Sequence, residues 1–165
     1  MICSKFQDFL DENFSLPIMK LTKEEMIILR EIKSCEYYPE SLARPINKSL
    51  RMSLGRFSGA VKRLKFKRLI RTTLDSDMNV IYPITNLGIL VSHILTTNIG
   101  QEMREEDLFF QFEIDKGIKG IFDKEVTLGM IDELLEAGII RREKKVYDKK
   151  RDGLTGETWI YFICE

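Results

Sequence analysis

Residues 53–70 read SLGRFSGAVKRLKFKRLI, and this stretch decides the fold. At about 100° per residue, a helix here has an apolar side that carries Leu54, Phe57, Val61 and Leu64. Its other side is cationic and small, and carries Gly55, Arg56, Gly59, Lys62 and Arg63. Each glycine weakens a helix by about 1 kcal/mol relative to alanine, so two on one exposed face indicate that another molecule approaches closely. We expect Ser53 to cap a helix that lies against a phosphate backbone; a solvated amphipathic helix is the alternative.

The charge of the chain is strongly sorted along the sequence. Over the whole chain, 26 Lys and Arg balance 26 Asp and Glu in 165 residues, which taken alone argues against a nucleic-acid-binding protein. Residues 39–73, however, carry 10 basic and 1 acidic side chains, whereas residues 74–138 carry 4 basic and 13 acidic ones. The basic segment contains the 53–70 stretch, so the charge of this segment agrees with binding to nucleic acid.

The first hundred residues are organised into helices followed by a hairpin and a further helix. Residues 4–14 and 22–34 predict helices, each with a capping-box pattern at its start, and a short helix follows at 40–46. After the 53–70 stretch, residues 71–74 and 80–83 predict two short strands around a turn-rich segment. Thr85 then opens a helix that runs through Leu95.

This order resembles the winged-helix family of DNA-binding domains, and most of all the MarR-type regulators. The resemblance covers residues 22–95. It rests on Val61-x-x-Leu64, on Leu69-Ile70 and on Tyr82-x-Ile84-Thr85-x-x-Gly88. Two positions depart from the family pattern: Arg68 stands where glycine usually precedes Leu-Ile, and Met78-Asn79 stand at the hairpin tip, where an arginine is common. A positive φ at Arg68 would cost free energy.

A second copy of the pattern lies 70 residues downstream, where residues 134–140 are in register with residues 64–70. It predicts a helix at 105–112, a weak element at 118–122, a helix capped by Thr127 that ends at Ala137, and strands at 139–146 and 158–164. The predicted fold class is therefore α+β, mainly α, with two tandem winged-helix lobes and short β-hairpin wings. The lobes span residues 1–97 and 105–165, and a linker joins them at 98–104.

The two lobes are expected to differ in charge. The helix of the second lobe turns Gly129, Asp132, Glu133 and Glu136 outward, and these carboxylates would repel phosphates. The hairpin that follows is basic and can follow a DNA backbone; a hairpin whose charges merely protect its edge is the alternative.

Residues that carry catalysis or bind metals are missing from the sequence. His93 is the only histidine, and Cys3, Cys35 and Cys164 are scattered, so a zinc site has no ligand set. No phosphate-binding glycine loop occurs, and the carboxylates fit solvated helix faces. The cysteine usage and the lack of a signal sequence or membrane span predict a cytoplasmic protein. Because no catalytic constellation is present, we expect a protein that is not an enzyme and has no cofactor.

We expect a transcriptional regulator that binds double-stranded DNA with the recognition helix 53–66 in the major groove. The residues expected to contact DNA are Arg44, Lys48, Arg51, Ser53, Arg56, Ser58, Lys62, Arg63, Lys65, Lys67, Lys149, Lys150 and Arg151. A homodimer is expected through the aromatic helix at 4–14 and the helix at 87–99, which resemble the dimer helices of MarR-like proteins. The alternative is a tandem winged-helix module for protein assembly that does not bind DNA, with a protein partner at the acidic second lobe. Tandem winged helices also resemble subunits of endosomal-sorting and chromosome-condensing complexes.

Overall fold

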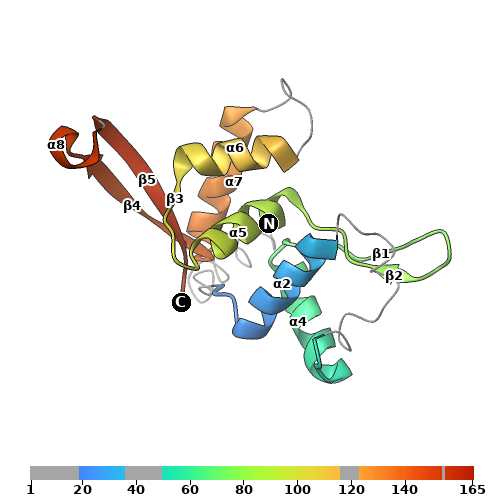
Figure 1. Ribbon diagram of the computed structural model, residues 1–165. Coiled ribbons are helices and arrows are strands. Elements are labelled where there is room, and N and C mark those ends of the chain that lie inside the picture. The colour runs from blue at the N-terminus through green and yellow to red at the C-terminus, as the bar shows by residue number, and fades with distance from the viewer. Residues whose placement is uncertain (1–18, 36–49, 116–122, 154) are drawn as a thin grey trace, which may run out of the picture.

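The computed structural model describes residues 19–35, 50–115, 123–153 and 155–165. The chain is α+β and mainly α, with antiparallel hairpins, as the sequence predicts (Figure 1). The described helices are α2 (Lys23–Cys35), α4 (Leu54–Phe66), α5 (Asn86–Thr97), α6 (Glu105–Asp115), α7 (Lys124–Glu136) and the short α8 (Lys149–Asp152). The described strands are β1 (Thr73–Leu74), β2 (Val80–Ile81), β3 (Met103–Arg104), β4 (Ile140–Tyr147) and β5 (Gly156–Ile163). The elements expected at 4–14, 40–46 and 118–122 lie outside the described residues.

Helix α4 forms where the 53–70 stretch predicts it. The Ser53 hydroxyl accepts a hydrogen bond from the Arg56 backbone N–H at 3.3 Å, which caps the helix start. Phe57 and Leu64 are buried in the core, and α4 packs against α2. Leu54, which the helical periodicity places on the apolar side, is instead 67% exposed, at the first position of the helix.

Helix α5 lies at the centre of the molecule and contacts α2, α6, α7 and β5 (Figure 1). Ile89, Leu90, Val91 and Ile94 are among its buried residues. The sequence assigns this helix to a dimer interface, but the structure uses its apolar residues inside the chain. One continuous core joins the two halves around it.

A tight junction connects the end of α4 to the start of α5. The Thr85 backbone N–H donates to the Leu69 carbonyl oxygen at 3.0 Å, and the Thr85 hydroxyl donates to the Arg68 carbonyl oxygen at 2.6 Å. A Cβ on Gly88 would lie 2.1 Å from that Leu69 oxygen, a distance that no side chain tolerates. The Thr85-x-x-Gly88 pattern is therefore explained by a close approach between the two backbones.

The 70-residue repeat is present in the backbone hydrogen bonds. At the end of α4, the N–H groups of Arg68 and Leu69 donate to the carbonyl oxygens of Lys65 and Leu64. At the end of α7, the N–H groups of Gly138 and Ile139 donate to the carbonyl oxygens of Leu135 and Leu134, each acceptor 70 positions further on. Both helices thus end in the same turn, after which Ile70 forms an isolated antiparallel bridge with Ile84 and the equivalent Ile140 begins β4.

The C-terminal half is built around a three-stranded antiparallel sheet in the order β3-β5-β4. Strand β3 lies within residues 98–104, which the sequence predicts to be a linker, and Met103 pairs with Tyr161 of β5. Strands β4 and β5 pair from Ile140↔Ile163 to Tyr147↔Gly156, so this hairpin is much longer than β1–β2. The α8 turn closes its outer end and ends at Gly153, whose φ is 69°.

The start of α7 differs from the sequence prediction. The Asp123 carboxylate caps the helix by accepting hydrogen bonds from the N–H groups of Glu125 and Val126, at 2.9 and 3.3 Å. Thr127, the predicted cap, lies inside the helix and is buried, and its hydroxyl donates to the Asp123 carbonyl oxygen at 3.0 Å. Asp123 and Thr127 are both residue types that cap helices, and they stand four positions apart. The helix begins at the earlier of the two, so Asp123 is the cap.

Candidate nucleic-acid interface

The outward side of α4 is the surface that the sequence predicts to bind DNA. A Cβ built on Gly55 would meet nothing within 4 Å, and one on Gly59 would meet only Nη1 of Arg63, at 3.4 Å. No described neighbour within the chain therefore requires either glycine, and this side of α4 is open to a close approach from outside. We call it the α4 face, which consists of Gly55, Ser58, Gly59, Lys62, Lys65 and Phe66.

Two arginines of α4 that the sequence assigns to DNA are paired with carboxylates of α2. Arg56 Nε donates to Oε1 of Glu24 at 2.8 Å, and Arg63 Nε donates to Oε1 of Glu25 at 2.9 Å. Both arginines remain well exposed and keep further N–H groups that can donate. They border the α4 face on one flank, where the carboxylates offset most of their charge.

The Glu25 carboxylate joins α2 to α4 inside the protein. It is fully buried, where it accepts a hydrogen bond from the Thr22 hydroxyl at 3.1 Å and forms ion pairs with Arg63 and Lys67. The Lys67 side chain is only 8% exposed and also donates to the Lys20 carbonyl oxygen at 2.9 Å. The prediction that Lys67 contacts DNA is therefore wrong, because its ammonium group points inward and holds the two helices together.

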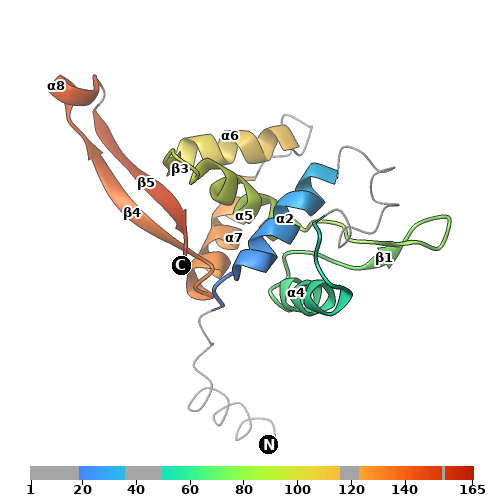
Figure 2. The same ribbon diagram turned by 60° about the horizontal axis from the view of Figure 1, so that its bottom comes forward.

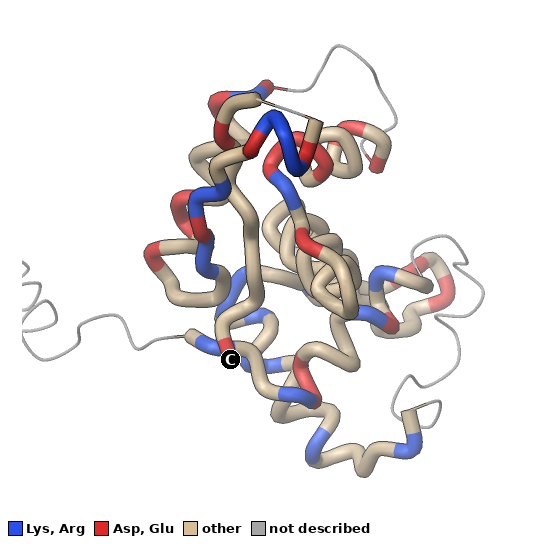
Figure 3. The backbone as a smooth tube through the Cα atoms, turned by 60° about the vertical axis from the view of Figure 1, so that its left-hand side comes forward, with Lys and Arg blue, Asp and Glu red and all other residues tan. Residues whose placement is uncertain are grey.

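The remaining predicted residues near α4 are exposed. Within the part of the chain that the structure describes, Lys62 and Lys65 make no ion pair. Arg51 precedes the helix, with a φ of 54°, and Ser58 stands one turn before Lys62. Figure 3 shows Lys and Arg gathered at the lower end of the molecule, where α4 lies. Arg44 and Lys48 lie outside the described residues.

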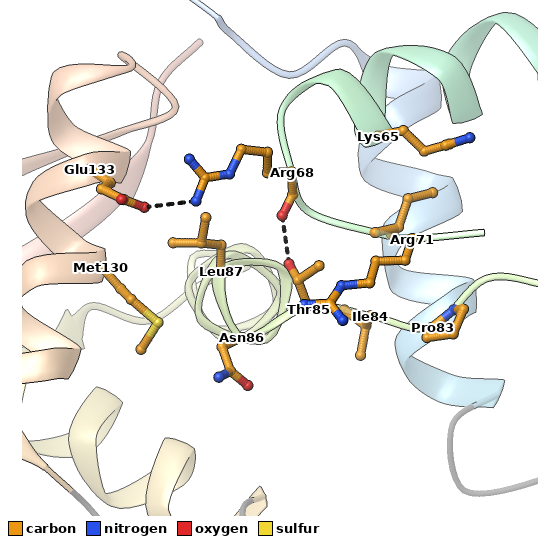
Figure 4. Close-up of a pocket in the computed structure, with 11 residues that line it drawn as sticks. Lys65, Arg68, Arg71, Pro83, Ile84, Thr85, Asn86, Leu87, Met130 and Glu133 are labelled. Atoms are coloured by element: carbon orange, nitrogen blue, oxygen red, sulfur yellow. Dashed lines mark hydrogen bonds and ion pairs between the residues drawn. The ribbon is translucent and has the colours of Figure 1, made fainter. Parts of the chain in front are cut away.

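A pocket of about 610 Å³ lies beside the C-terminal end of α4 (Figure 4). Arg68 and Arg71 reach into it on either side of the first residues of α5. The Arg68 guanidinium is 3.7 Å from the carboxylate of Glu133 on α7. The sequence does not predict this pocket. The one feature of the sequence that points to it is Arg68, which stands where the second repeat has Gly138.

The cations of α8 lie far from the α4 face. Lys149, Lys150 and Arg151 are all exposed, and Arg151 Nε is 3.5 Å from the Asp152 carboxylate. Figures 1 and 2 both show α8 at the outer end of the β4–β5 hairpin, at the opposite end of the molecule from α4. The structure therefore does not bring the two predicted groups of DNA contacts onto one surface.

The strands of this long hairpin carry largely balanced charges. Their ion pairs are Arg141–Glu143 at 2.6 Å, Lys144–Glu157 at 2.7 Å and Lys145–Glu102 at 2.9 Å. The hydrogen bond to Glu102 raises the pKa of Lys145. The Arg142 guanidinium lies 4.1 Å from the centre of the Trp159 ring, a cation–π contact. Three of the four basic residues of β4 are thus paired with carboxylates, and the fourth, Arg142, stacks on Trp159.

Helix α7 is the counterpart of α4 in the repeat, and its outward side is acidic, as the sequence predicts. A Cβ on Gly129 would meet nothing within 4 Å. Val126, at the start of the helix, is 58% exposed. We call this side the α7 face, which consists of Glu125, Val126, Gly129, Asp132, Glu133 and Glu136.

The described residues contain no group of three or more His, Cys, Asp or Glu that is placed to hold a metal ion. His93 instead pairs through Nε2 with Asp115, which also lies 3.4 Å from the Lys33 ammonium. None of the helices described has the length and apolar character needed to span a membrane.

Comparison with known proteins adds no assignment to this geometry. No family model, no curated protein and no solved structure matches the chain.

Proposed function

We propose that the protein binds double-stranded DNA as a winged-helix regulator, with α4 as its recognition helix. The observation that carries this proposal is the open glycine surface of the α4 face beside unpaired lysines. Gly55 and Gly59 lower the stability of the helix without relieving any contact inside the described chain. A bulky ligand that lies directly on the helix, such as the floor and walls of a DNA major groove, accounts for both.

The charge around α4 favours contact through its N-terminal half. Glu133 of α7 lies beside Arg68, so carboxylates border the C-terminal end of α4 and would repel phosphates there. The N-terminal half instead carries Gly55 and Ser58 and follows Arg51, and Lys62 stands one turn after Ser58. Recognition helices of this class also contact base edges with their N-terminal residues, which agrees with this orientation.

The number of unpaired cations sets the expected salt dependence. Arg51, Lys62 and Lys65 make no ion pair among the described residues, whereas the arginines on the flank are paired with Glu24 and Glu25. About three phosphate contacts correspond to a slope of about −3 in a plot of log K against log salt concentration. A slope near zero would show that the attraction is not to phosphates.

A titration of a random-sequence duplex with the full chain, followed by fluorescence anisotropy at several salt concentrations, tests the proposal. The double charge reversal Lys62→Glu with Lys65→Glu is expected to abolish binding. The matched control is Lys149→Glu with Lys150→Glu, which makes the same change in net charge at the distant α8 and is expected to retain binding. Equal losses in the two variants would mean that only net charge matters, and the α4 face would not be the site.

A role in protein assembly is the second candidate, because Phe66 is 75% exposed on the α4 face. Exposed aromatic side chains are enriched at protein interfaces and add little to phosphate binding. If this candidate holds, the wild-type chain leaves the duplex unbound even at low salt. The substitution Phe66→Ser would then weaken association with a protein partner.

A further inference from the structure

The outward faces of α4 and α7 are complementary in charge at equivalent positions of the repeat. Shifted by 70 residues, Gly59 corresponds to Gly129, Lys62 to Asp132, Arg63 to Glu133 and Phe66 to Glu136. Each helix buries the corresponding side, because Leu64 and Leu134 are both in the core. The same small, open helix surface is therefore present twice in one chain, once cationic and once anionic.

The α7 face has carboxylates that the described chain leaves unpaired. Glu133 pairs with Arg68, but Glu125, Asp132 and Glu136 are exposed and make no ion pair among the described residues. Repulsion excludes a phosphate backbone from this face, whereas a cationic helix fits it. Because Gly129 carries no side chain, the axis of such a helix can come close, within the range of ordinary helix packing.

The two faces also border common hollows on the surface. Phe66 of α4 and Glu136 of α7 line one hollow of about 180 Å³, and Lys65 and Glu133 line the neighbouring pocket. The ion pair between Arg68 and Glu133 spans the same junction. A partner that covers this region therefore meets a cationic helix and an anionic helix side by side.

We propose that the occupant of this surface is a second copy of the chain, related by a two-fold axis. The rotation lays the α4 face of each copy on the α7 face of the other, so each copy contributes both signs and the contact closes as a dimer. It places Lys62 and Lys65 of one copy against Asp132 and Glu136 of the other. Phe66, which is exposed in the single chain, becomes covered.

Such a dimer covers the surface proposed above for DNA. It follows that the dimer and the DNA complex exclude each other, so added duplex converts dimer into DNA-bound monomer. Only this competition depends on the proposed function; the contact between copies does not. A measurement of mass in the absence of DNA therefore tests the contact by itself.

A charge-swap experiment in the analytical ultracentrifuge tests the dimer. We expect the wild-type chain to sediment as a dimer at low salt and to dissociate as salt is raised. Lys62→Glu with Lys65→Glu makes both faces anionic, and Asp132→Lys with Glu136→Lys makes both cationic. Each variant alone is expected to dimerise at least about tenfold more weakly, and an equimolar mixture of the two is expected to restore dimers.

The mixture is decisive because a variant that simply misfolds does not regain a partner. Lys149→Glu with Lys150→Glu is the matched control and is expected to dimerise like the wild type. A wild-type monomer at about 100 µM, above the range in which specific dimers normally form, would overturn the proposal. So would a dimer that both charge-reversed variants retain, or a mixture that stays monomeric while both variants keep their circular dichroism.

Discussion

Arg68 and Gly138 adopt the same left-handed turn at equivalent positions of the two repeats, with φ values of 62° and 74°. Glycine reaches this conformation without strain, whereas a residue with a Cβ loses about 1 kcal/mol or more. The first repeat thus has an arginine at a position where the second repeat has glycine, which adopts this left-handed conformation without strain. What the arginine gains is its contact with Glu133 at the junction of α4 and α7.

We expect Arg68→Gly to stabilise the protein by about 0.5–1 kcal/mol. Relief of the left-handed strain outweighs the loss of an ion pair whose partners are both more than half exposed. Gly138→Arg is the reciprocal change and is expected to destabilise by about 1 kcal/mol. Urea denaturation of both variants measures these differences, and a loss of stability in Arg68→Gly would show that the ion pair outweighs the strain.

Replacement of the buried carboxylate Glu25 by glutamine is expected to destabilise the protein by about 3 kcal/mol. The change leaves the ammonium of Lys67 buried without a counter-charge, and Arg63 keeps only its longer contact with Glu24, at 3.8 Å. The matched control is Glu24→Gln, whose partner Arg56 is two-thirds exposed, and its expected loss is below about 1 kcal/mol. Thermal denaturation compares the two, and similar losses would contradict a special role for Glu25.

Replacing both exposed glycines of α4 by alanine is expected to raise the stability of the protein and to lower its affinity for DNA. Gly55→Ala with Gly59→Ala gains about 1–2 kcal/mol in helix stability, since the only described neighbour of either new methyl group is the flexible Arg63 guanidinium, at 3.4 Å from the Cβ of residue 59. The same methyl groups hold a duplex away from the helix, so affinity for DNA is expected to fall. Chemical denaturation and DNA anisotropy on the same sample test this; unchanged affinity would show that close approach at the glycines is unnecessary.

Gly88→Ala is expected to have the opposite effect on stability. Its methyl group would lie 2.1 Å from the Leu69 carbonyl oxygen, so the junction between α4 and α5 must open. We expect a loss of at least about 2 kcal/mol, in the range of overpacked cores. A denaturation midpoint like that of the wild type would mean that the backbone adjusts without strain.

Local signals allowed much of this arrangement to be predicted from the sequence. Ser53 and Thr85 each cap a helix by accepting a hydrogen bond from the N–H three positions ahead, and the repeat is visible because the turns after α4 and α7 share a pattern. The ion pairs between the carboxylates of α2 and the arginines of α4 could not be predicted in this way. Glu25 and Arg63 are 38 positions apart, and neither helix alone shows which side of it meets the other.

The C-terminal half shows a second reason for missed features. Strand β3 consists of two residues, too few to produce an alternation, and it forms because Met103 and Arg104 meet β5 nearly sixty residues later. The α8 turn likewise depends on the Asp148 carboxylate, which accepts a hydrogen bond from the Lys150 N–H at 3.0 Å, within a segment that otherwise resembles a simple hairpin tip. The opposite placement of α8 and α4 depends on the direction of the whole hairpin, which no local pattern contains.

The central position of α5 has a consequence for how the protein unfolds. The helix completes the N-terminal repeat through its junction with α4, and it also packs on α6, α7 and β5. Neither half can therefore lose its order without exposing α5 to water, and we expect a single cooperative transition in calorimetry rather than two. For the same reason, a chain divided at residues 98–104 is not expected to yield two autonomous fragments, because both would need the same helix.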